Sequence, residues 1–285
     1  MHVSMGLLEE VEAVAREAGS AIMDIYARDF SVWEKEDKSP LTEADAAAHE
    51  IIARRLERLQ PVLPVLSEEA VGDFSGADSS GRYWLVDPLD GIREFIKRSG
   101  EFTVNIALIE NGRPILGVVY APALDVAYLG AEGLGAFKRG ADGMRAPIRV
   151  AEHQEGSSWR VAGSRSHTGD SLTAFLQQLG SHELMPVGSS LKFCLVAEGN
   201  ADVYPRMGPT SLWDTAAAQC VVEQAGGGVI QLTGEPISYA DPSAALNPFF
   251  VVHGKSAVNW VDLVRGSRHH VTASQTDPST GVMPA

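Results

Sequence analysis

With 285 residues, the chain is long enough for one or two domains that share a sizeable core, and its 45% hydrophobic and 21% charged content is that of a folded globular protein. This composition excludes disordered, collagen-like and coiled-coil classes. Its 37 acidic and 23 basic side chains give a formal net charge of −14. Because no Lys/Arg run interrupts this acidic balance, we expect no polymeric nucleic acid as a partner.

Sequence features relevant to location point to the cytoplasm. The N-terminus lacks a basic region followed by an apolar run, and no stretch reaches the roughly 18 apolar residues of a membrane-spanning helix. The two cysteines, Cys194 and Cys220, lie in apolar contexts and have neither zinc-site spacing nor the density of a disulfide scaffold. We therefore interpret them as buried free thiols in a reducing cytoplasm.

The first part of the chain predicts helices followed by a sheet. Apolar residues recur at helical spacing over 5–28, which predicts an amphipathic helix. A second helix is expected to begin near Thr42, with Asp45 three residues later completing a capping box. Strand patterns over 83–139 predict a largely antiparallel sheet, in which Asn111-Gly112 is a hairpin turn and 126–140 a returning strand.

The second part predicts a mixture of helices and strands. Helices are expected at 170–179, at 190–198, and from Trp213 to the glycine run 226–228. We predict an N-terminal α+β half over 1–150, a C-terminal α/β half over 151–265 that packs on it, and a disordered tail over 266–285.

Two carboxylates are concentrated at one strand end. Asp87 ends an apolar run, Pro88 is expected to stop the ladder, and Asp90-Gly91 turns the chain into a helix beginning at Ile92. Carboxylates held this close repel each other unless a cation neutralises them, and an all-oxygen donor set selects Mg²⁺ or Mn²⁺. The alternative is that Asp90 is only the N-cap of the helix.

The start of this helix favours an anion. Backbone N–H groups at Gly91 and Ile92 would form an anion site beside the metal site. Metal and phosphate together indicate a phosphate ester as substrate.

Four separated motifs resemble the inositol monophosphatase superfamily of Mg²⁺-dependent, lithium-sensitive phosphatases. They are Thr42-Glu43-Ala44-Asp45, Glu68-Glu69, Asp87-Pro88-Leu89-Asp90-Gly91, and Trp213-Asp214 followed by a small-residue helix and a glycine run. The resemblance extends from about residue 7 to 253. It implies an α/β fold of alternating α-β-α-β-α layers.

Within this superfamily, three segments are most similar to the 3′(2′),5′-bisphosphate nucleotidases of bacterial sulfur metabolism. They are Arg93-Glu94-Phe95-Ile96, the segment GEFTVNIA over 100–107, and the segment SLKFCLVAEG over 190–199.

The resemblance implies a set of metal ligands. Two or three Mg²⁺ ions would be held by Glu68, Asp87, Asp90, Asp214 and the backbone carbonyl of Leu89. For Asp214, the residues alone equally fit an N-cap of the helix that follows.

The resemblance also implies the catalytic residues. Asp45, Glu68 and Asp87 would activate water, Asp45 together with a threonine that follows the Asp-Gly turn. This chain has Ile92 at that position, and isoleucine has no hydroxyl. Asp45 by itself also fits an acid favoured in the first turn of a helix, and Glu69 fits a solvated neighbour of Glu68.

Substrate contacts are implied next to the metal ligands. Besides Glu68, Leu89, Asp90, Gly91, Ile92 and Asp214, the resemblance places Gly163-Ser164-Arg165-Ser166-His167, Ser189, Lys192 and Arg206 where this branch holds the second phosphate and the sugar. Cationic side chains suit a second phosphate, so Lys192 and Arg206 are the preferred candidates.

We therefore expect a cytoplasmic, Mg²⁺-dependent phosphatase that hydrolyses adenosine 3′,5′-bisphosphate to AMP and phosphate. The alternatives are an inositol- or sugar-phosphate phosphatase, and a weakly active protein that binds a nucleotide bisphosphate, motivated by Ile92. Peripheral association with the inner face of the cell membrane and the oligomeric state stay open.

Overall fold

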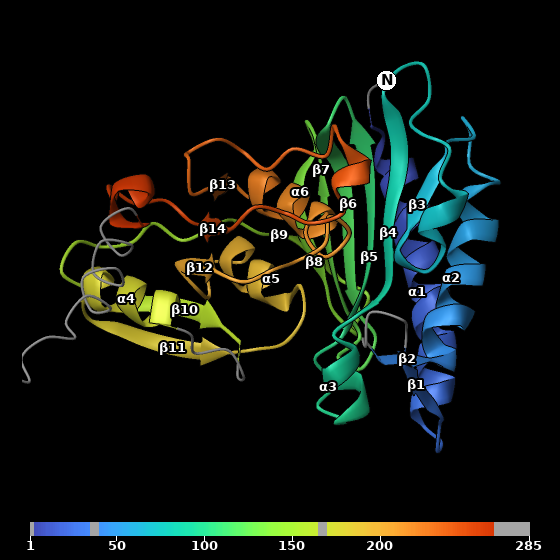
Figure 1. The fold of residues 1–285 in the computed structure, drawn as a ribbon, viewed down its shortest axis with the longest axis horizontal. Coiled ribbons are helices and arrows are strands. Elements are labelled where there is room, and N and C mark those ends of the chain that lie inside the picture. Colours follow the sequence, from blue (N-terminus) through green and yellow to red (C-terminus); the bar gives the residue numbers. More distant parts are fainter. Residues whose placement is uncertain (1–2, 35–39, 165–169, 265–285) are drawn as a thin grey trace, which may run out of the picture.

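The computed structural model describes residues 3–34, 40–164 and 170–264, and within them helices and sheets alternate in layers (Figure 1). A helix pair comes first, followed by a seven-stranded sheet, a second helix pair, a five-stranded sheet and a last helix. The layered α/β fold expected from the sequence is confirmed.

The first layer is formed by α1 (Met5–Tyr26) and α2 (Glu43–Leu56), which pack against each other and against one face of the seven-stranded sheet. Ser4 caps α1 through its hydroxyl, and Thr42 caps α2 within the predicted capping box. A short hairpin of β1 (Val32–Glu34) and β2 (Pro40–Thr42) leads into α2.

The seven-stranded sheet has the order β3-β4-β5-β6-β7-β8-β9, with only β3 and β4 parallel among its described neighbours. Its strands are β3 (Val65–Ser67), β4 (Arg82–Asp90), β5 (Thr103–Glu110), β6 (Arg113–Ala121), β7 (Val126–Ala131), β8 (Gly135–Arg139) and β9 (Arg145–Pro147). The antiparallel sheet and its hairpin turn at Asn111-Gly112 are confirmed. The segment expected as one returning strand is instead the hairpin β7–β8.

Strand β4 continues past Pro88, contrary to the sequence prediction. Its ladder with β5 pairs Asp87 with Asn105 and then Asp90 with Thr103, so the register shifts between the two aspartates. Proline is tolerated here because a bulge leaves its missing N–H outside the ladder. The bulge therefore places both aspartates at the strand end without breaking the strand.

The middle layer is formed by α5 (Leu191–Ala197) and α6 (Ala216–Gln224), which lie between the two sheets. Helix α6 crosses β6 and β7 above Gly117 and Gly130, which face each other across the two strands. A Cβ atom at Gly117 would lie 2.1 Å from the Ala217 carbonyl oxygen. The paired glycines thus let the α6 backbone rest directly on the sheet.

The five-stranded sheet has the order β11-β10-β12-β14-β13, and α4 (Asp170–Leu179) covers its outer face. The strands are β10 (Trp159–Gly163), β11 (His182–Pro186), β12 (Val203–Arg206), β13 (Gly228–Gln231) and β14 (Phe250–His253). The helices expected near 170–179, 190–198 and 213–225 correspond to α4, α5 and α6. One hydrophobic cluster contains residues from both sides of position 150. The division of the chain into two halves at this position stays a prediction.

Three further predictions concern the cysteines, membrane-spanning helices and the C-terminal tail. Cys194 and Cys220 are free and buried, as expected, and burial raises the pKa of both thiols. No helix in the described part of the chain is long and apolar enough to cross a membrane. The predicted disordered tail, 266–285, lies outside the described residues.

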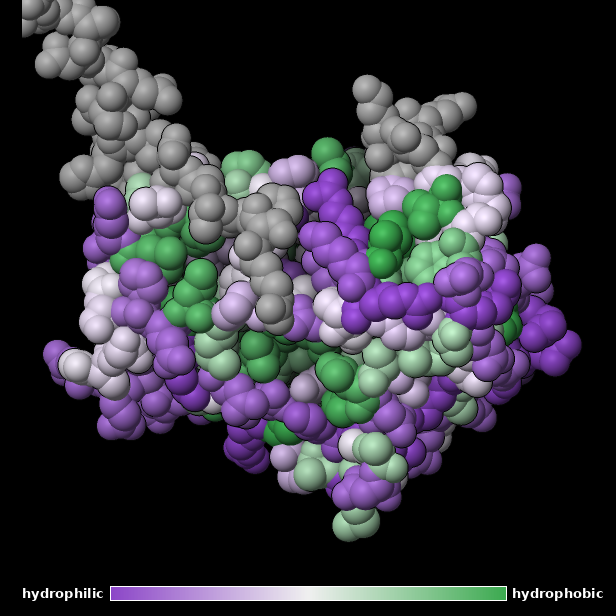
Figure 2. All heavy atoms as spheres, turned by 90° about the horizontal axis from the view of Figure 1, so that it is seen from below, coloured by the Kyte–Doolittle hydropathy of each residue, from purple (hydrophilic) through white to green (hydrophobic). Residues whose placement is uncertain are grey.

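Exposed large apolar side chains come from separate elements, among them Trp33 of β1 and Leu184 of β11. On the face seen from below, apolar side chains form separate patches among hydrophilic ones (Figure 2). Scattered exposed apolar residues of this kind are normal for a globular protein.

Candidate active site

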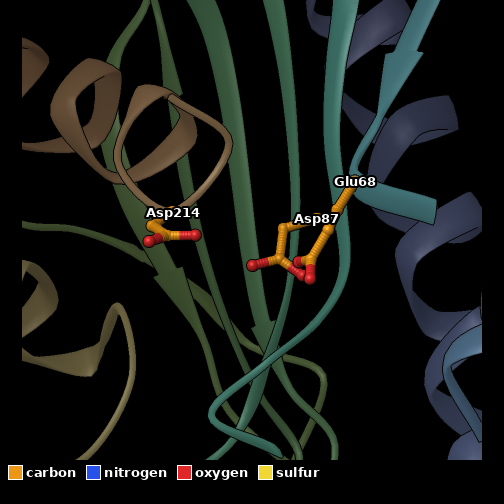
Figure 3. Close-up of side chains that lie close together, drawn as sticks. All are labelled: Glu68, Asp87 and Asp214. Atoms are coloured by element: carbon orange, nitrogen blue, oxygen red, sulfur yellow. The ribbon is translucent and has the colours of Figure 1, made fainter. Parts of the chain in front are cut away.

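Three carboxylates from three separate segments converge at one end of β4 (Figure 3). Glu68 begins the 3₁₀ helix η1 (Glu68–Asp73) directly after β3, Asp87 lies on β4, and Asp214 lies in the turn before α6. One oxygen of each lies within 4.8 Å of the others, with Asp87 buried and the other two partly buried. The third carboxylate, Asp214, comes from more than 100 residues further along the chain.

The cluster is electrostatically unfavourable without a cation. Burial raises the pKa of Asp87 well above its ordinary range, and the charges of Glu68, Asp90 and Asp214 raise it further. Burial and the Asp90 charge likewise raise the pKa of Asp214. A divalent cation would remove this repulsion, and hard oxygen donors are what Mg²⁺ prefers. The residues therefore fit the cation that the sequence implies.

Asp90 lies beside the cluster and is not an N-cap. The N-cap of α3 (Ile92–Ile96) is Gly91, in the left-handed conformation with φ 90°, and it makes no side-chain cap. Asp90 Oδ2 instead accepts hydrogen bonds from the backbone N–H (2.6 Å) and hydroxyl (2.8 Å) of Ser190. The alternative interpretation of Asp90 is thus wrong, because its carboxylate turns away from α3 toward α5.

The N-cap interpretation of Asp214 is also wrong. The N-cap of α6 is Thr215, one residue later. The Asp214 carboxylate accepts the backbone N–H of Ser211 at 2.8 Å, which fixes the preceding turn. This leaves the side chain aimed toward Glu68 and Asp87 (Figure 3).

Asp45 combines a structural role with proximity to the cluster. Its Oδ2 closes the capping box of α2 by accepting the backbone N–H and the hydroxyl of Thr42, both at 2.8 Å. The side chain is buried, which raises its pKa to about 6, and the charges of Glu69 and Glu68 contribute. The first-turn interpretation of Asp45 is therefore correct, and the same carboxylate also lies near both glutamates.

Helix α3 begins at Ile92 as predicted and is short, with five residues from Ile92 to Ile96. One turn carries only a small dipole, so an anion at this point depends on the backbone N–H groups rather than on the helix as a whole. The Ile92 side chain is partly buried and packs against the hydrophobic cluster beneath β4. A side chain without a hydroxyl thus occupies the position where the sequence resemblance implies a threonine.

A pocket adjoins the cluster and is lined by residues of both halves, among them Asp90, Gly91, Ser189, Lys192, Arg206 and Asp214. The Lys192 side chain is 8% exposed, donates to the Ser189 carbonyl at 2.6 Å, and lies over the Tyr204 ring. Burial lowers the Lys192 pKa, while the charge of Asp90 opposes this shift. The pocket lining therefore combines acidic side chains with basic ones, among them Arg93, Lys192 and Arg206.

The remaining predicted contacts have different outcomes. Gly163 ends β10, and Ser164 lines the same pocket. Arg165, Ser166 and His167 lie outside the described residues. The Leu89 side chain is buried in the core, so only its backbone carbonyl is left for the predicted metal contact.

Comparisons with known proteins identify the family of this chain. A profile of the inositol monophosphatase family matches residues 7–267. The chain belongs to the inositol monophosphatase family. A curated family relative from Salmonella typhimurium, named 3′(2′),5′-bisphosphate nucleotidase CysQ, is 52% identical over 86% of this chain and 99% of its own. The protein of the same name from Escherichia coli K12 is 50% identical with the same coverage.

Solved structures of the inositol monophosphatase family show the same fold. CysQ from Bacteroides thetaiotaomicron superposes with a TM-score of 0.75 and 38% identity, covering 88% of this chain and 97% of its own. An inositol monophosphatase from Anabaena superposes with a TM-score of 0.69 and 25% identity, covering 94% and 96%.

Sequence reasoning did not identify Ser190 and Asn105 as site residues. The Ser190 hydroxyl lies within hydrogen-bond distance of Asn105, Asp90 and the backbone of Asp214. The available signal was Asn105 itself, a polar side chain within an apolar strand, since buried amides need partners. Ser190 gave no such signal, because a serine before a helix is typical of an N-cap.

Proposed function

We propose that the chain is a Mg²⁺-dependent 3′(2′),5′-bisphosphate nucleotidase that hydrolyses adenosine 3′,5′-bisphosphate to AMP and phosphate. The observation that carries this proposal is the placement of the acidic cluster at the edge of a pocket lined by Lys192 and Arg206. A substrate with two phosphates needs both features, one for the reacting phosphate and one for the other. Relatives about 50% identical over nearly their whole length carry the name of this activity.

In this proposal Glu68, Asp87, Asp90, Asp214 and the Leu89 carbonyl hold two or three Mg²⁺ ions. Bound Mg²⁺ would supply Lewis-acid stabilisation of the phosphate oxygens and of the leaving group, and would lower the pKa of the attacking water. Hydrogen bonds from backbone N–H groups hold the two aspartates in position: the Asp87 carboxylate accepts from Leu89, and the Asp214 carboxylate accepts from Ser211. Backbone N–H groups at Gly91 and Ile92 would face the reacting phosphate.

Asp45 and Glu68 are proposed to orient the attacking water, with Asp87 close by. A positioned base contributes about 10²–10⁴ in rate. Because Thr42 already uses Asp45 Oδ2, the other carboxylate oxygen is the one proposed to accept a proton. Ile92 supplies no hydroxyl to connect this carboxylate with the water, so we expect a slower reaction than in relatives with threonine.

Lys192 and Arg206 are proposed to bind the second phosphate, with Ser189 beside them. Arg206 lies at the end of β12 and lines the pocket, and its donation to the Pro209 carbonyl at 2.7 Å fixes one nitrogen of the guanidinium. Guanidinium and ammonium groups suit phosphate oxygens.

The test is phosphate release from a panel containing adenosine 3′,5′-bisphosphate, inositol 1-phosphate and a sugar phosphate, with and without Mg²⁺. We expect the bisphosphate to give the highest kcat/KM, Li⁺ to inhibit, and Ca²⁺ not to replace Mg²⁺, because the larger ion accepts looser geometry. Preference for inositol or sugar phosphates would favour the broader phosphatase. Tight Mg²⁺-dependent binding of the bisphosphate without turnover would favour a binding protein, which is the alternative that Ile92 supports.

Location and assembly belong to the same proposal. We propose a cytoplasmic enzyme, and sedimentation of lysate fractions distinguishes it from one held peripherally at the inner membrane face. Light scattering of the purified protein gives its oligomeric state.

A further inference from the structure

Ser190 occupies the position of an N-cap at α5, yet its hydroxyl does not cap that helix. Ser4 at α1 shows what a capping serine does, since its hydroxyl accepts the backbone N–H of Leu7 at 3.1 Å. The Ser190 hydroxyl points to the metal-ligand turns instead. Ser190 is buried, with 2% of its surface exposed, so its hydroxyl needs hydrogen-bond partners within the protein. Because these partners are not the N–H groups of α5, the hydroxyl has a role other than capping.

The Ser190 hydroxyl joins segments from both halves of the molecule. Its Oγ lies 2.8 Å from Asp90 Oδ2, 2.9 Å from the Asp214 carbonyl oxygen and 2.9 Å from Asn105 Nδ2. Asp90 ends β4 of the first sheet, whereas Asp214 precedes α6 in the second half. One hydroxyl therefore contacts two proposed metal-ligand residues that lie 124 positions apart.

Asn105 limits where the Ser190 hydroxyl can donate its proton. A serine hydroxyl carries a single proton, and the Asn105 amide donates to its oxygen. The hydroxyl proton can therefore be donated to Asp90 Oδ2 or to the Asp214 carbonyl oxygen. Asn105 also lies directly opposite Asp87 in the β4–β5 ladder, which connects the arrangement to the centre of the acidic cluster.

We propose that Ser190, oriented by Asn105, is a positioning residue that sets the separation of the Asp90 and Asp214 turns and thereby the affinity of the site for divalent cations. The inference rests on the proposed function in that Asp90 and Asp214 are taken as ligands. The inference goes further because it attributes the separation of these two turns to one hydroxyl. Residues that hold metal ligands in place commonly change metal affinity about 10–100-fold when they are removed.

Ser190→Ala tests the inference, because it deletes the hydroxyl and keeps the backbone N–H that binds Asp90. Mn²⁺ binding is measured by electron paramagnetic resonance without substrate, alongside the Mg²⁺ dependence of phosphate release. We expect Mn²⁺ affinity to fall about tenfold or more, while KM for the bisphosphate at saturating Mg²⁺ changes less than twofold. Ser4→Ala is the matched control, expected to lower the melting temperature and leave Mn²⁺ affinity unchanged.

Three outcomes overturn the inference: a loss of Mn²⁺ affinity under threefold in Ser190→Ala, an equal loss in Ser4→Ala, or a KM change as large as the affinity change. If Ser190→Ala does not fold, Ser190→Cys replaces it under the same criteria, since the thiol keeps the volume but donates weakly. Failure of the proposed function is recognised separately, because the unmodified protein would then bind no Mn²⁺ or release no phosphate.

Discussion

The Asp45 carboxylate accepts both the backbone N–H and the hydroxyl of Thr42, so the only threonine hydroxyl bonded to it among the described residues belongs to its own capping box. The position after the Asp-Gly turn, where the sequence resemblance implies a second hydroxyl, is filled by Ile92. Asp45 is thus held by Thr42, and Ile92 cannot donate a second hydroxyl to it. This arrangement leads to predictions about rate and about pH.

We predict that Ile92→Thr raises kcat about tenfold or more with little change in KM, because it restores a hydroxyl that acts mainly in the transition state. Ile92→Val is the matched control, since valine has the shape of threonine without the hydroxyl. Steady-state kinetics at saturating Mg²⁺ measure both. Equal kcat in the Thr and Val variants would show that packing, and not the hydroxyl, decides the rate.

The raised pKa of Asp45 predicts a pH dependence of stability in the metal-free protein. Its pKa is about 6 in the folded state against an ordinary 3.8, so between these values the folded state binds more protons than the unfolded state. The contribution of Asp45 to the free energy of unfolding therefore falls as pH rises through this window, by about 3 kcal/mol in total at about 1.4 kcal/mol for each pKa unit.

Urea unfolding of the wild type and Asp45→Asn in EDTA, from pH 4 to 7, measures this contribution. The stability of the wild type relative to the variant is expected to fall with rising pH. Asp24→Asn, at an exposed position on α1, is the control for the effect of an Asp-to-Asn substitution as such. A constant difference for Asp45→Asn would mean that this carboxyl titrates normally.

Asp87→Asn and Asp214→Asn are each predicted to abolish Mg²⁺-dependent hydrolysis and the Mg²⁺-induced rise in melting temperature. Each removes one negative ligand from a site that depends on charge neutralisation. In EDTA, neither variant should melt below the wild type, because each relieves the repulsion that raises both pKa values. Calorimetric scans with and without Mg²⁺ test this, and near-parental activity at limiting Mg²⁺ would refute the metal site.

Arg206→Ala is predicted to raise KM for adenosine 3′,5′-bisphosphate about tenfold or more, with a much smaller effect on a monophosphate substrate. A charge-assisted contact to a phosphate accounts for a change of this size, about 1.4 kcal/mol or more. The control is Arg113→Ala, a 71% exposed arginine on β6 whose neighbour Glu132 is 3.8 Å away. Parallel changes for both substrates would place Arg206 at the reacting phosphate instead.

Local patterns in the sequence determined several helices and turns of this protein. The capping box of Thr42 and Asp45, the Asn111-Gly112 turn and the helices depend on hydrogen bonds and side chains within a few residues, so neighbours in the sequence are sufficient to predict them. An acidic site could also be predicted from the sequence, because carboxylates in close succession repel one another unless a cation neutralises them.

Only the tertiary structure decided which distant groups meet. Asp214 reaches Glu68 and Asp87 because α6 rests directly on the sheet, which requires the absence of side chains at Gly117 and Gly130. Local preferences would have made Ser190 a cap and ended β4 at Pro88. The packing of the two halves instead directs that hydroxyl to Asp90 and Asp214, and a bulge continues the strand. Such choices depend on contacts between residues far apart in sequence, which outweigh local preferences of about 1 kcal/mol.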